Sequence, residues 1–550
     1  MVRWVFMVRS VFNVFTRVSK SKQETILTAA GVIALIFAIS AVLGFIRNRL
    51  YATYFGDSTE LGVLFAADDI PTIVFSLIVS GALSTSFIPV FNRVYKRDQL
   101  MSWSLVSNAI NISLGAFLIL FSIIFSFSDY LVANVIAANS NLTAEDLRLF
   151  SSILRILMLA QIGFIISSFY TSVLQSFNHF VIPALAPVML NLGVIIFMIA
   201  FYEPLGIYAP AWGTVFGSIL HMLIQYPFIK EKGFSYNLIF DIKDKGVREI
   251  YKLMLPRTLA QTTQKLIIPL YTNLALYISG ASNVILAFAD DIQTVPVRIF
   301  GISIGQAALP IFASTFDEND TTPFKTLVIK TLYQVVFFVL PISVLVFILR
   351  VPLVRLAVGS SKYPWESTVM TAYTLAFFSI SFVSQALVLV ISRAFYTMYD
   401  TKTPLKVSII SMIVNAILAI VFVRIFGLGV WSLGLAFTIS SFVNMGVLLS
   451  YLYKKLEQLD DFYDLLYKIN RISISSFIMG MALYIPMKIF DNFVFDTTKT
   501  LDLIVLTFVV TMFGLGTFII LGRLFKLKEL DYLYIVLNKI KLRWNPKTIS

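Results

Sequence analysis

The sequence predicts an all-α membrane protein of about 14 transmembrane helices, in which two related six-helix lobes are followed by two further helices. Of its 550 residues, 58% are hydrophobic and 13% are charged, whereas soluble globular chains carry roughly 25% charged residues. A soluble core cannot bury so much apolar surface, so we expect most of the chain to lie in a lipid bilayer.

The predicted spans are apolar segments long enough to cross the hydrocarbon core, which takes about 20 helical residues. They cover residues 25–48, 61–92, 103–127, 148–175, 181–202, 205–229, 250–278, 282–315, 326–350, 367–397, 404–426, 429–453, 471–490 and 500–523. The second and eighth segments are unusually long and contain Asp, Pro and Gly, so we expect these helices to be interrupted. The expected hinge residues are Pro71, Gly81, Pro89, Pro296, Gly301 and Pro310.

The distribution of Lys and Arg predicts the orientation of the chain. These residues flank the apolar segments and concentrate at both ends, and the positive-inside rule places such clusters in the cytoplasm. An even number of spans puts both termini there. The predicted domains are a basic amphipathic N-terminal segment (1–24), an N-lobe (25–229), a cytoplasmic linker (230–249), a C-lobe (250–455), two appended helices (456–524) and a basic cytoplasmic tail (525–550).

One short motif occurs in both lobes. Residues 67–72 (Ala-Asp-Asp-Ile-Pro-Thr) in the second span correspond to residues 289–294 (Ala-Asp-Asp-Ile-Gln-Thr) in the eighth. The similarity continues downstream, where residues 86–91 correspond to residues 307–312. A duplicated half that places carboxylates inside the membrane is typical of transporters built from two repeats, whose substrate site lies where the repeats meet.

Ionisable side chains inside a bilayer are costly, so each is a functional candidate. Here they follow one helical face of the first two spans of each lobe, and the other spans are far more uniformly apolar. We expect these four faces to surround one central, water-filled cavity. Its predicted lining consists of Arg47, Arg49, Arg257, Gln261, Gln264, Lys265 and Arg298, together with the carboxylates Asp68, Asp69, Asp290 and Asp291.

The cations predict an anionic ligand, a phosphate or a pyrophosphate. The guanidinium fork of Arg matches phosphate oxygens, and Lys adds a point charge. The carboxylates can hold the arginines in place, bind a coupling cation or bind sugar hydroxyls, and Asp–Arg pairs between helices can also be purely structural. We expect Arg155, alone in the fourth span, and His221, alone in an apolar helix, to have structural roles.

Several motifs, in order along most of the chain, resemble the MurJ (MviN) lipid II flippases, members of the multidrug, oligosaccharidyl-lipid and polysaccharide exporter superfamily. They are Leu-Gly-Phe-Ile-Arg at 43–47, Gly-Ala-Leu-Ser-Thr-Ser-Phe-Ile-Pro-Val at 81–90, Ile-Pro-Ala-Leu-Ala-Pro at 182–187, Leu-Met-Leu-Pro at 253–256 and Lys-Thr-Pro at 402–404.

The resemblance implies a multi-pass protein of the bacterial cytoplasmic membrane that moves the undecaprenyl-pyrophosphate-linked peptidoglycan precursor, lipid II, to the outer leaflet. It implies alternating access, a cationic cavity between the lobes, a groove for the lipid tail at residues 456–524, and coupling to the membrane potential, Na⁺ or H⁺. We expect a monomer that contacts membrane lipids and has no nucleic-acid partner, cofactor or metal site; there are no cysteines, which excludes disulfides and thiolate metal sites.

The chain departs from this family at the cavity charges. Arg47 is kept, but the family's basic pair in the second helix falls on Phe75-Ser76, and its Tyr-Ala-Asp-Arg in the eighth is Phe-Ala-Asp-Asp at 288–291. Our hypothesis is that Arg257, Lys265 and Arg298 supply the missing positive charge from other positions.

Three alternatives stay open at this point. A flippase for another polyprenyl-linked glycan would differ only in the headgroup, and a cation-coupled drug antiporter would belong to the same superfamily. A remote alternative is an intramembrane prenyl-diphosphate enzyme whose Asp pairs hold Mg²⁺. That chemistry needs further acidic ligands at short helical spacing, and none follows Asp69 or Asp291. We therefore predict a transporter and not an enzyme.

Overall fold

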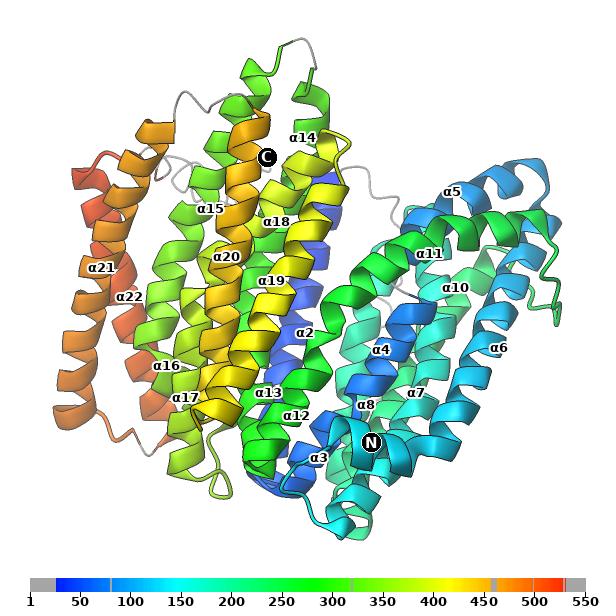
Figure 1. The fold of residues 1–550 in the computed structure, drawn as a ribbon, viewed down its shortest axis with the longest axis horizontal. Helices are drawn as coiled ribbons and strands as arrows, with labels where there is room; N and C mark the ends of the chain where they lie inside the picture. Colours follow the sequence, from blue (N-terminus) through cyan, green and yellow to red (C-terminus); the bar gives the residue numbers. More distant parts are fainter. Residues whose placement is uncertain are drawn as a thin grey trace, which may run out of the picture. The chain divides into compact units, whose positions relative to one another are not determined.

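The computed structural model describes residues 26–79, 82–317, 320–456, 462–497, 499–527 and 530, and this part of the chain is helical (Figure 1). The all-α membrane class is therefore confirmed. The N-terminal segment 1–24, most of the tail 525–550 and the expected hinge Gly81 lie outside the described residues. So do the side chains of Arg257, Gln261, Gln264 and Pro310.

Within the described residues, ten helical segments are long and apolar enough to cross a membrane. Each overlaps a predicted span; they are Thr59–Ile78, Gln99–Ile136, Ala144–Ser176, Val181–Leu205, Thr322–Ile348, Trp365–Thr397, Lys402–Ile425, Trp431–Lys455, Tyr467–Phe493 and Thr500–Leu524. The other four predicted spans fall on α2 (Ile26–Tyr54), on the short helix α9 (Tyr208–Leu223), and on two interrupted pairs, α11–α12 (Lys245–Lys265 and Ile267–Ile278) and α13–α14 (Gly280–Pro296 and Ser303–Thr315).

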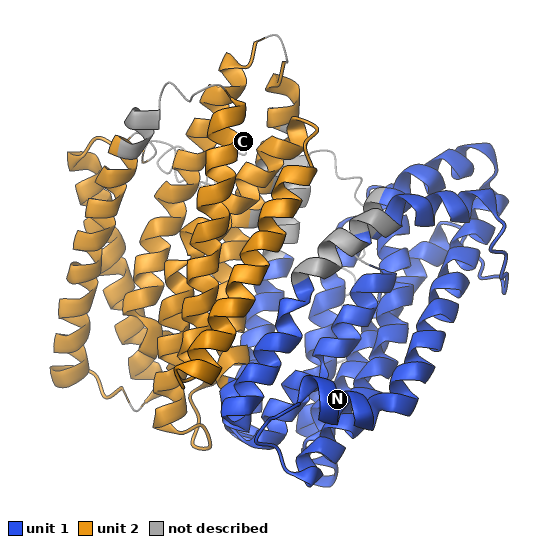
Figure 2. Ribbon diagram, in the orientation of Figure 1, with its two compact units in different colours: residues 1–284 blue, residues 285–550 orange. Residues whose placement is uncertain are grey.

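The chain divides into two compact units, residues 1–284 and 285–550 (Figure 2). The helices of unit 1 are α2 (Ile26–Tyr54), α3 (Thr59–Ala67), α4 (Asp69–Ile78), α5 (Ala82–Arg97), α6 (Gln99–Leu131), η1 (Val132–Ile136), α7 (Ala144–Ser176), α8 (Val181–Leu205), α9 (Tyr208–Leu223), α10 (Tyr226–Glu231), α11 (Lys245–Lys265) and α12 (Ile267–Ile278). The helix α13 (Gly280–Pro296) begins in unit 1 and continues into unit 2.

The remaining helices belong to unit 2. They are η2 (Val297–Ile302), α14 (Ser303–Thr315), α15 (Thr322–Ile348), α16 (Arg350–Val358), α17 (Trp365–Ile380), α18 (Phe382–Thr397), α19 (Lys402–Ile420), η3 (Val421–Ile425), α20 (Trp431–Lys455), α21 (Phe462–Phe493) and α22 (Thr500–Leu524). This division rests on packing, whereas the predicted lobes rest on the sequence repeat, and the lobe boundaries stay a prediction.

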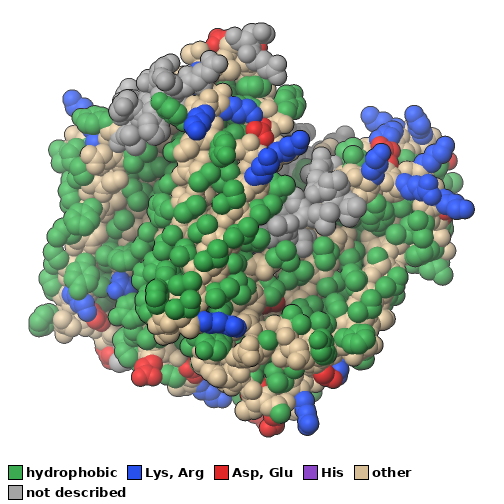
Figure 3. All heavy atoms as spheres, viewed as in Figure 1, with side chains coloured by type: hydrophobic (Ala, Val, Ile, Leu, Met, Phe, Trp, Pro, Cys, Tyr) green, Lys and Arg blue, Asp and Glu red, His purple; other side chains and the backbone are tan. Residues whose placement is uncertain are grey.

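Hydrophobic side chains cover much of the surface in the view of Figure 3, and Lys and Arg lie mainly toward its upper and lower margins. Large apolar side chains are exposed on several helices; Ile119, Phe477 and Phe508 have exposed fractions of 65%, 68% and 62%. Soluble monomers rarely expose contiguous apolar patches larger than a few hundred Å². A surface of this kind is suited to lipid.

The seventh predicted span packs within unit 1. Arg93 of α5 forms two hydrogen bonds of 3.0 and 2.8 Å with Glu249 of α11. The Tyr251 hydroxyl lies 2.7 Å from Ser113 Oγ of α6, and Asn273 of α12 donates to the carbonyls of Ile136 and Ala138. These contacts tie α11 and α12 to α5, α6 and the segment after η1.

The linker between α10 and α11 is fastened along α6 by two buried asparagines. Asn108 Nδ2 donates to the Asp241 carbonyl (2.8 Å) and its Oδ1 accepts the Asp241 amide (2.9 Å). Asn111 Nδ2 donates to the carbonyls of Asn237 (3.2 Å) and Ile239 (2.8 Å). Because these side-chain amides pair with backbone N–H and C=O groups of a segment without regular structure, they fix the path of that segment along α6.

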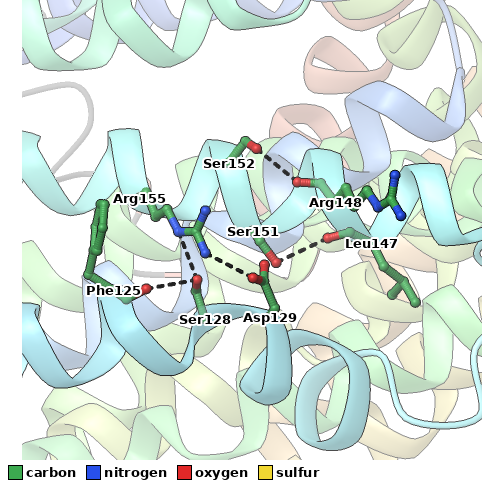
Figure 4. Close-up of polar contacts among 8 residues, drawn as sticks. All are labelled: Phe125, Ser128, Asp129, Leu147, Arg148, Ser151, Ser152 and Arg155. Carbon is green, nitrogen blue, oxygen red and sulfur yellow. Dashed lines mark hydrogen bonds and ion pairs between the residues drawn. The ribbon is translucent and has the colours of Figure 1, made fainter.

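Arg155 joins α6 to α7 (Figure 4). Its Nε donates to Ser128 Oγ (2.8 Å), its Nη2 donates to Asp129 Oδ2 (3.0 Å), and its guanidinium carbon lies 5.1 Å from the centroid of the Phe125 ring. The side chain therefore has an anionic partner and an aromatic surface within the protein. These contacts support the structural interpretation of Arg155.

His221 also has partners within the protein. Its Nδ1 lies 2.6 Å from Ser167 Oγ of α7, and Gln225 Nε2 donates to the same hydroxyl (2.5 Å). Thr171 Oγ1 completes the group by donating to Gln225 Oε1 (2.9 Å). This buried polar group links α7 to the end of α9 and supports a structural role for His221.

The last two helices pack against α15 in unit 2. Phe337 of α15 and Phe518 of α22 place their ring centroids 5.7 Å apart, and Met479, Leu483 and Val510 are fully buried in the same cluster. Arg355 of α16 donates from Nη2 to the Thr497 carbonyl (2.5 Å) before α22. The appended helices are thus an integral part of unit 2.

The second and eighth predicted spans are both interrupted, as expected. Asp68 ends α3 and begins α4, and Pro71 lies in the first turn of α4, where its missing amide costs no hydrogen bond. Pro296 ends α13, and the π-helix η2, which contains Gly301, follows before α14. Whether these positions act as hinges stays a prediction.

Gly62 and Gly280 form a tight crossing within unit 1. A Cβ at residue 62 would collide with the carbonyl oxygen of Gly280, and Asn283 Nδ2 donates to the Gly62 carbonyl (2.8 Å).

We expect Gly62→Ala to lower the free energy of unfolding by roughly 2 kcal/mol, because overpacked sites force backbone shifts. Thermal unfolding of the purified protein measures this. Gly446→Ala is the matched control, since a Cβ there meets nothing within 4 Å; equal melting temperatures would contradict the tight crossing.

Asp400 fastens the junction between α18 and α19 to the end of α20. Its Oδ1 accepts the Thr403 amide (3.0 Å), and its Oδ2 accepts the Thr403 hydroxyl (2.9 Å) and Lys455 Nζ (2.8 Å). Burial raises the pKa of Asp400, but the hydrogen bonds from Lys455 and Thr403 outweigh it and lower the pKa to about 2.

We expect Asp400→Asn to lower the free energy of unfolding by about 1 kcal/mol at pH 7, the upper range for a solvent-screened ion pair. A carboxylate whose pKa is depressed in the folded state stabilises the fold above its unfolded pKa of about 4. That contribution is lost as the pH falls toward 2, so the two proteins should converge over this interval. Thermal unfolding at several pH values tests it, with Asp491→Asn as the control. A difference that does not change with pH would contradict the role of the Asp400 charge.

Candidate functional site

Arg47 is held by side chains of its own helix and of α8. Its Nη1 donates to Asn191 Oδ1 (3.2 Å), and its Nε and Nη2 lie 3.4 and 3.3 Å from Asn48 Oδ1. Asn191, which is 8% exposed, is fixed in turn by donating to the Ser40 carbonyl (3.2 Å). The half-buried guanidinium is therefore oriented by a buried amide on a neighbouring helix.

Arg49 was predicted to line the same cavity. Residues two apart on an α-helix differ by roughly 200° around its axis, so Arg49 lies on nearly the opposite face of α2 from Arg47. It is half-buried. The structure thus does not bring these two arginines together.

The first Asp pair lies at the interruption between α3 and α4. Asp68 is exposed and accepts a long hydrogen bond from Thr72 Oγ1 (3.5 Å). The charges of Arg47 and Lys265 both act on its carboxylate. Asp69 instead accepts a hydrogen bond from Thr272 of α12. Three predicted site residues of unit 1, Arg47, Asp68 and Lys265, are thus electrostatically coupled.

Lys265 lies at a helix break within the seventh predicted span, for which a continuous helix was expected. It is the last residue of α11, and Leu266 separates it from α12. The seventh predicted span is thus discontinuous, like the second and the eighth. Discontinuous transmembrane helices commonly line substrate sites, because their free ends present charges and backbone groups there. Arg257, Gln261 and Gln264 lie on α11, but their side chains lie outside the described ones.

The second Asp pair lies on α13 in unit 2. Asp290 and Asp291 are both exposed. Asp290 Oδ1 accepts a hydrogen bond from Gln293 Nε2 (2.8 Å), and the charge of Arg298 on η2 also acts on Asp290. In both copies of the repeated motif, the first Asp is therefore exposed and within the electrostatic reach of a cation.

Gln385 of α18 extends the second group and was missed in the sequence. Its Nε2 donates to Gln293 Oε1 (3.1 Å) and to Ser381 Oγ (2.8 Å). Gln293 is 4% exposed, and a buried amide is costly unless it is hydrogen-bonded. A single Gln in an apolar span was the only available signal, and nothing in the sequence identified its partner.

Two groups near the helix interruptions place a carboxylate within the electrostatic reach of cations: Asp68 with Arg47 and Lys265, and Asp290 with Arg298. Such pairs can exchange partners: an anionic ligand can take the cation, while the carboxylate takes a proton or a metal ion. Within each unit this chemistry suits reversible binding of an oxyanion.

Comparisons with known proteins identify the family. The family described as "Lipid II flippase MurJ" matches residues 51–504. The probable lipid II flippase MurJ of Buchnera aphidicola subsp. Acyrthosiphon pisum is 27% identical over 497 residues, covering 88% of this chain and 91% of that protein. The lipid II flippase MurJ of Burkholderia cenocepacia is 24% identical over 395 residues, covering 71% and 77%.

Solved structures share the fold. The inward closed conformation of lipid II flippase MurJ has a TM-score of 0.74 at 22% identity, covering 90% of this chain and 98% of that one. An inward-facing multidrug resistance MATE family transporter of the MOP superfamily has a TM-score of 0.64 at 14% identity, covering 78% and 99%. Because the family match spans most of the sequence, this chain belongs to the MurJ lipid II flippase family.

Proposed function

We propose that the protein flips lipid II from the inner to the outer leaflet of the bacterial cytoplasmic membrane, with both termini in the cytoplasm. Family membership supports this activity, and so do the names of the relatives. The observation that carries it at the site is the oriented guanidinium of Arg47, held by Asn191 beside Asp68. A guanidinium fixed in this way is suited to the oxygens of a pyrophosphate.

In this proposal the carboxylates and the pyrophosphate compete for the same cations. Without substrate, Asp68 compensates Arg47 and Lys265, and Asp290 compensates Arg298. When the pyrophosphate enters, the cations bind its oxygens in place of the carboxylates. Asp68 and Asp290 then bind a proton or Na⁺. Within each unit, the carboxylate thereby lowers the excess positive charge of the unloaded cations, which a low-dielectric surrounding would penalise.

Alternating access would follow from bending at the helix interruptions, with Asp68 between α3 and α4, Leu266 between α11 and α12, and η2 after Pro296. A pyrophosphate carries about two negative charges, and each charge moved through the membrane potential involves about 2.3 kcal/mol per 100 mV. With the inside negative, this favours outward movement of the substrate. Return of the unloaded, cationic site to the inward-facing state would be the step coupled to the membrane potential or to an ion. The lipid tail would lie beside α21 and α22.

Complementation tests the proposal. A bacterial strain depleted of its own lipid II flippase should regain growth when this chain is expressed, and lipid II should become accessible at the outer leaflet. Failure of both, with normal amounts of the protein in the membrane, would overturn the proposal and favour a different polyprenyl-linked headgroup.

A further inference from the structure

Arg393 of α18 is a cation that the proposed mechanism does not use. Its Nε is buried and has no hydrogen-bond acceptor, and no described residue forms an ion pair with its guanidinium. The Nε lies against Gly305 of α14, where a Cβ would come within 2.8 Å of it. The guanidinium fits there because residue 305 is glycine.

The surroundings of Arg393 continue the polar group that begins at Asp290. Gln385, Leu389, Arg393 and Tyr396 recur at the spacing of one helical face. Gln385 contacts Gln293 of α13, Leu389 lies against Gly301 of η2, and Arg393 lies against Gly305 of α14. This face of α18 therefore runs alongside the interrupted helix that carries the second Asp pair.

The missing acceptor distinguishes Arg393 from a structural arginine. Arg155 shows what a structural arginine has in this fold, namely a hydroxyl and a carboxylate at hydrogen-bond distance. Helix carboxyl ends favour cations, but this attraction falls off within the last turn, and the last turn of α18 does not include Arg393. The helix end therefore does not explain a buried Nε without an acceptor, which is an unfavourable arrangement. An acceptor from outside the chain would complete it.

Tyr396 supplies a second donor at the same place. It lies one turn beyond Arg393, it is 47% exposed, and it interacts electrostatically with Arg393. A guanidinium and a phenol together offer N–H and O–H donors to an oxyanion, and neither group carries a negative charge at neutral pH that would repel it.

We propose that Arg393 and Tyr396 form an anion-binding site in unit 2 that takes a phosphate oxygen of the polyprenyl-pyrophosphate glycolipid. The identity of the ligand rests on the proposed flippase function. The site itself rests on Arg393, Gly305 and Tyr396.

Binding measurements on the purified full-length protein test this site. The probes are undecaprenyl pyrophosphate, undecaprenol, inorganic pyrophosphate and phosphatidylglycerol. We expect Arg393→Gln to weaken binding of undecaprenyl pyrophosphate roughly 30-fold, the effect of losing a charge-assisted contact, and to leave undecaprenol unaffected. Arg393→Lys should retain part of the affinity, and Lys406→Gln on the exposed side of α19 should match the wild type.

Gly305→Ala provides a variant that keeps the arginine. Its Cβ would displace the flexible end of Arg393, so folding should survive while affinity for undecaprenyl pyrophosphate falls. The loss should vanish in the Arg393→Gln background, because both changes act through one group. Thermal unfolding separates these losses from misfolding.

The outcomes separate this inference from the proposed function. If the wild type and Arg393→Gln bind undecaprenyl pyrophosphate equally, the inference falls and the flippase proposal stands. If Arg393→Gln loses only phosphatidylglycerol, or only inorganic pyrophosphate, the site belongs to a phospholipid headgroup or to free phosphate, and the assignment is overturned. If the wild type binds none of the phosphate probes, both proposals fail.

Discussion

Replacing Arg47 with glutamine is expected to reduce lipid II flipping roughly 100-fold, since a charge-assisted hydrogen bond to a substrate is worth about 3 kcal/mol when it is desolvated. Arg47 is the cavity arginine that the family resemblance predicts to be kept, and Asn191 orients it. Its removal also leaves the Asp68 carboxylate with one cation fewer. Lipid II accessibility at the outer leaflet, measured in the complemented strain, gives the effect.

The orientation of Arg47 matters in this prediction as well as its charge. Lysine cannot bond Asn191 and a pyrophosphate with the same fork, so Arg47→Lys should recover less than a tenth of the lost activity. Asn191→Ala should weaken flipping about 10-fold by releasing the guanidinium. Lys252→Gln removes an exposed charge from α11 and is the control. Wild-type flipping by Arg47→Gln would refute the role of Arg47 in substrate binding.

The positions of the helices could be predicted from the sequence because membrane spans depend mainly on length and apolarity. The fourth span was expected at 148–175 and the structure has α7 at Ala144–Ser176; the fifth was expected at 181–202 and α8 is Val181–Leu205. The interruptions near Pro71 and Pro296 were also expected, because proline lacks the amide that continues a helix. These features are local, and local sequence determines them.

The partners of the site residues could not be predicted, because they come from distant helices. Asn191 lies 144 residues from Arg47, and Gln385 lies 92 residues from Gln293. Neither amide belongs to a motif with helical spacing. The break at Leu266 was missed although Pro269 lies in the first turn of α12, as Pro71 lies in the first turn of α4, so this interruption had a local signal in the sequence. The packing of α11 and α12 in unit 1 depends on contacts such as Arg93 with Glu249, which the repeat does not reveal.

The hypothesis of relocated charge makes the second large prediction. Replacing Arg257, Lys265 and Arg298 together with glutamine should reduce flipping to the level of the depleted strain. Lys265 and Arg298 act on Asp68 and Asp290 respectively, so their loss leaves each Asp pair less compensated and the pyrophosphate with fewer cations. Each single replacement should cost roughly 10-fold, a single charge-assisted contact. A triple variant of Arg248, Lys252 and Lys406 removes the same charge from outside the site and should flip normally.

Adding a positive charge at residue 291 of the triple variant tests the hypothesis that the cavity charge has moved to other positions. The resemblance predicts Arg where this chain has Asp291, an exposed residue of α13. If Arg257, Lys265 and Arg298 replace that charge, Asp291→Arg should recover part of the flipping in the triple variant, because it adds a cation beside Asp290 and removes a competing carboxylate. In the wild type the same change should give no gain, since the positive charge is already supplied. Normal flipping by the triple variant would refute relocation, and an inactive triple variant that Asp291→Arg does not improve would place the needed charge at the three residues themselves.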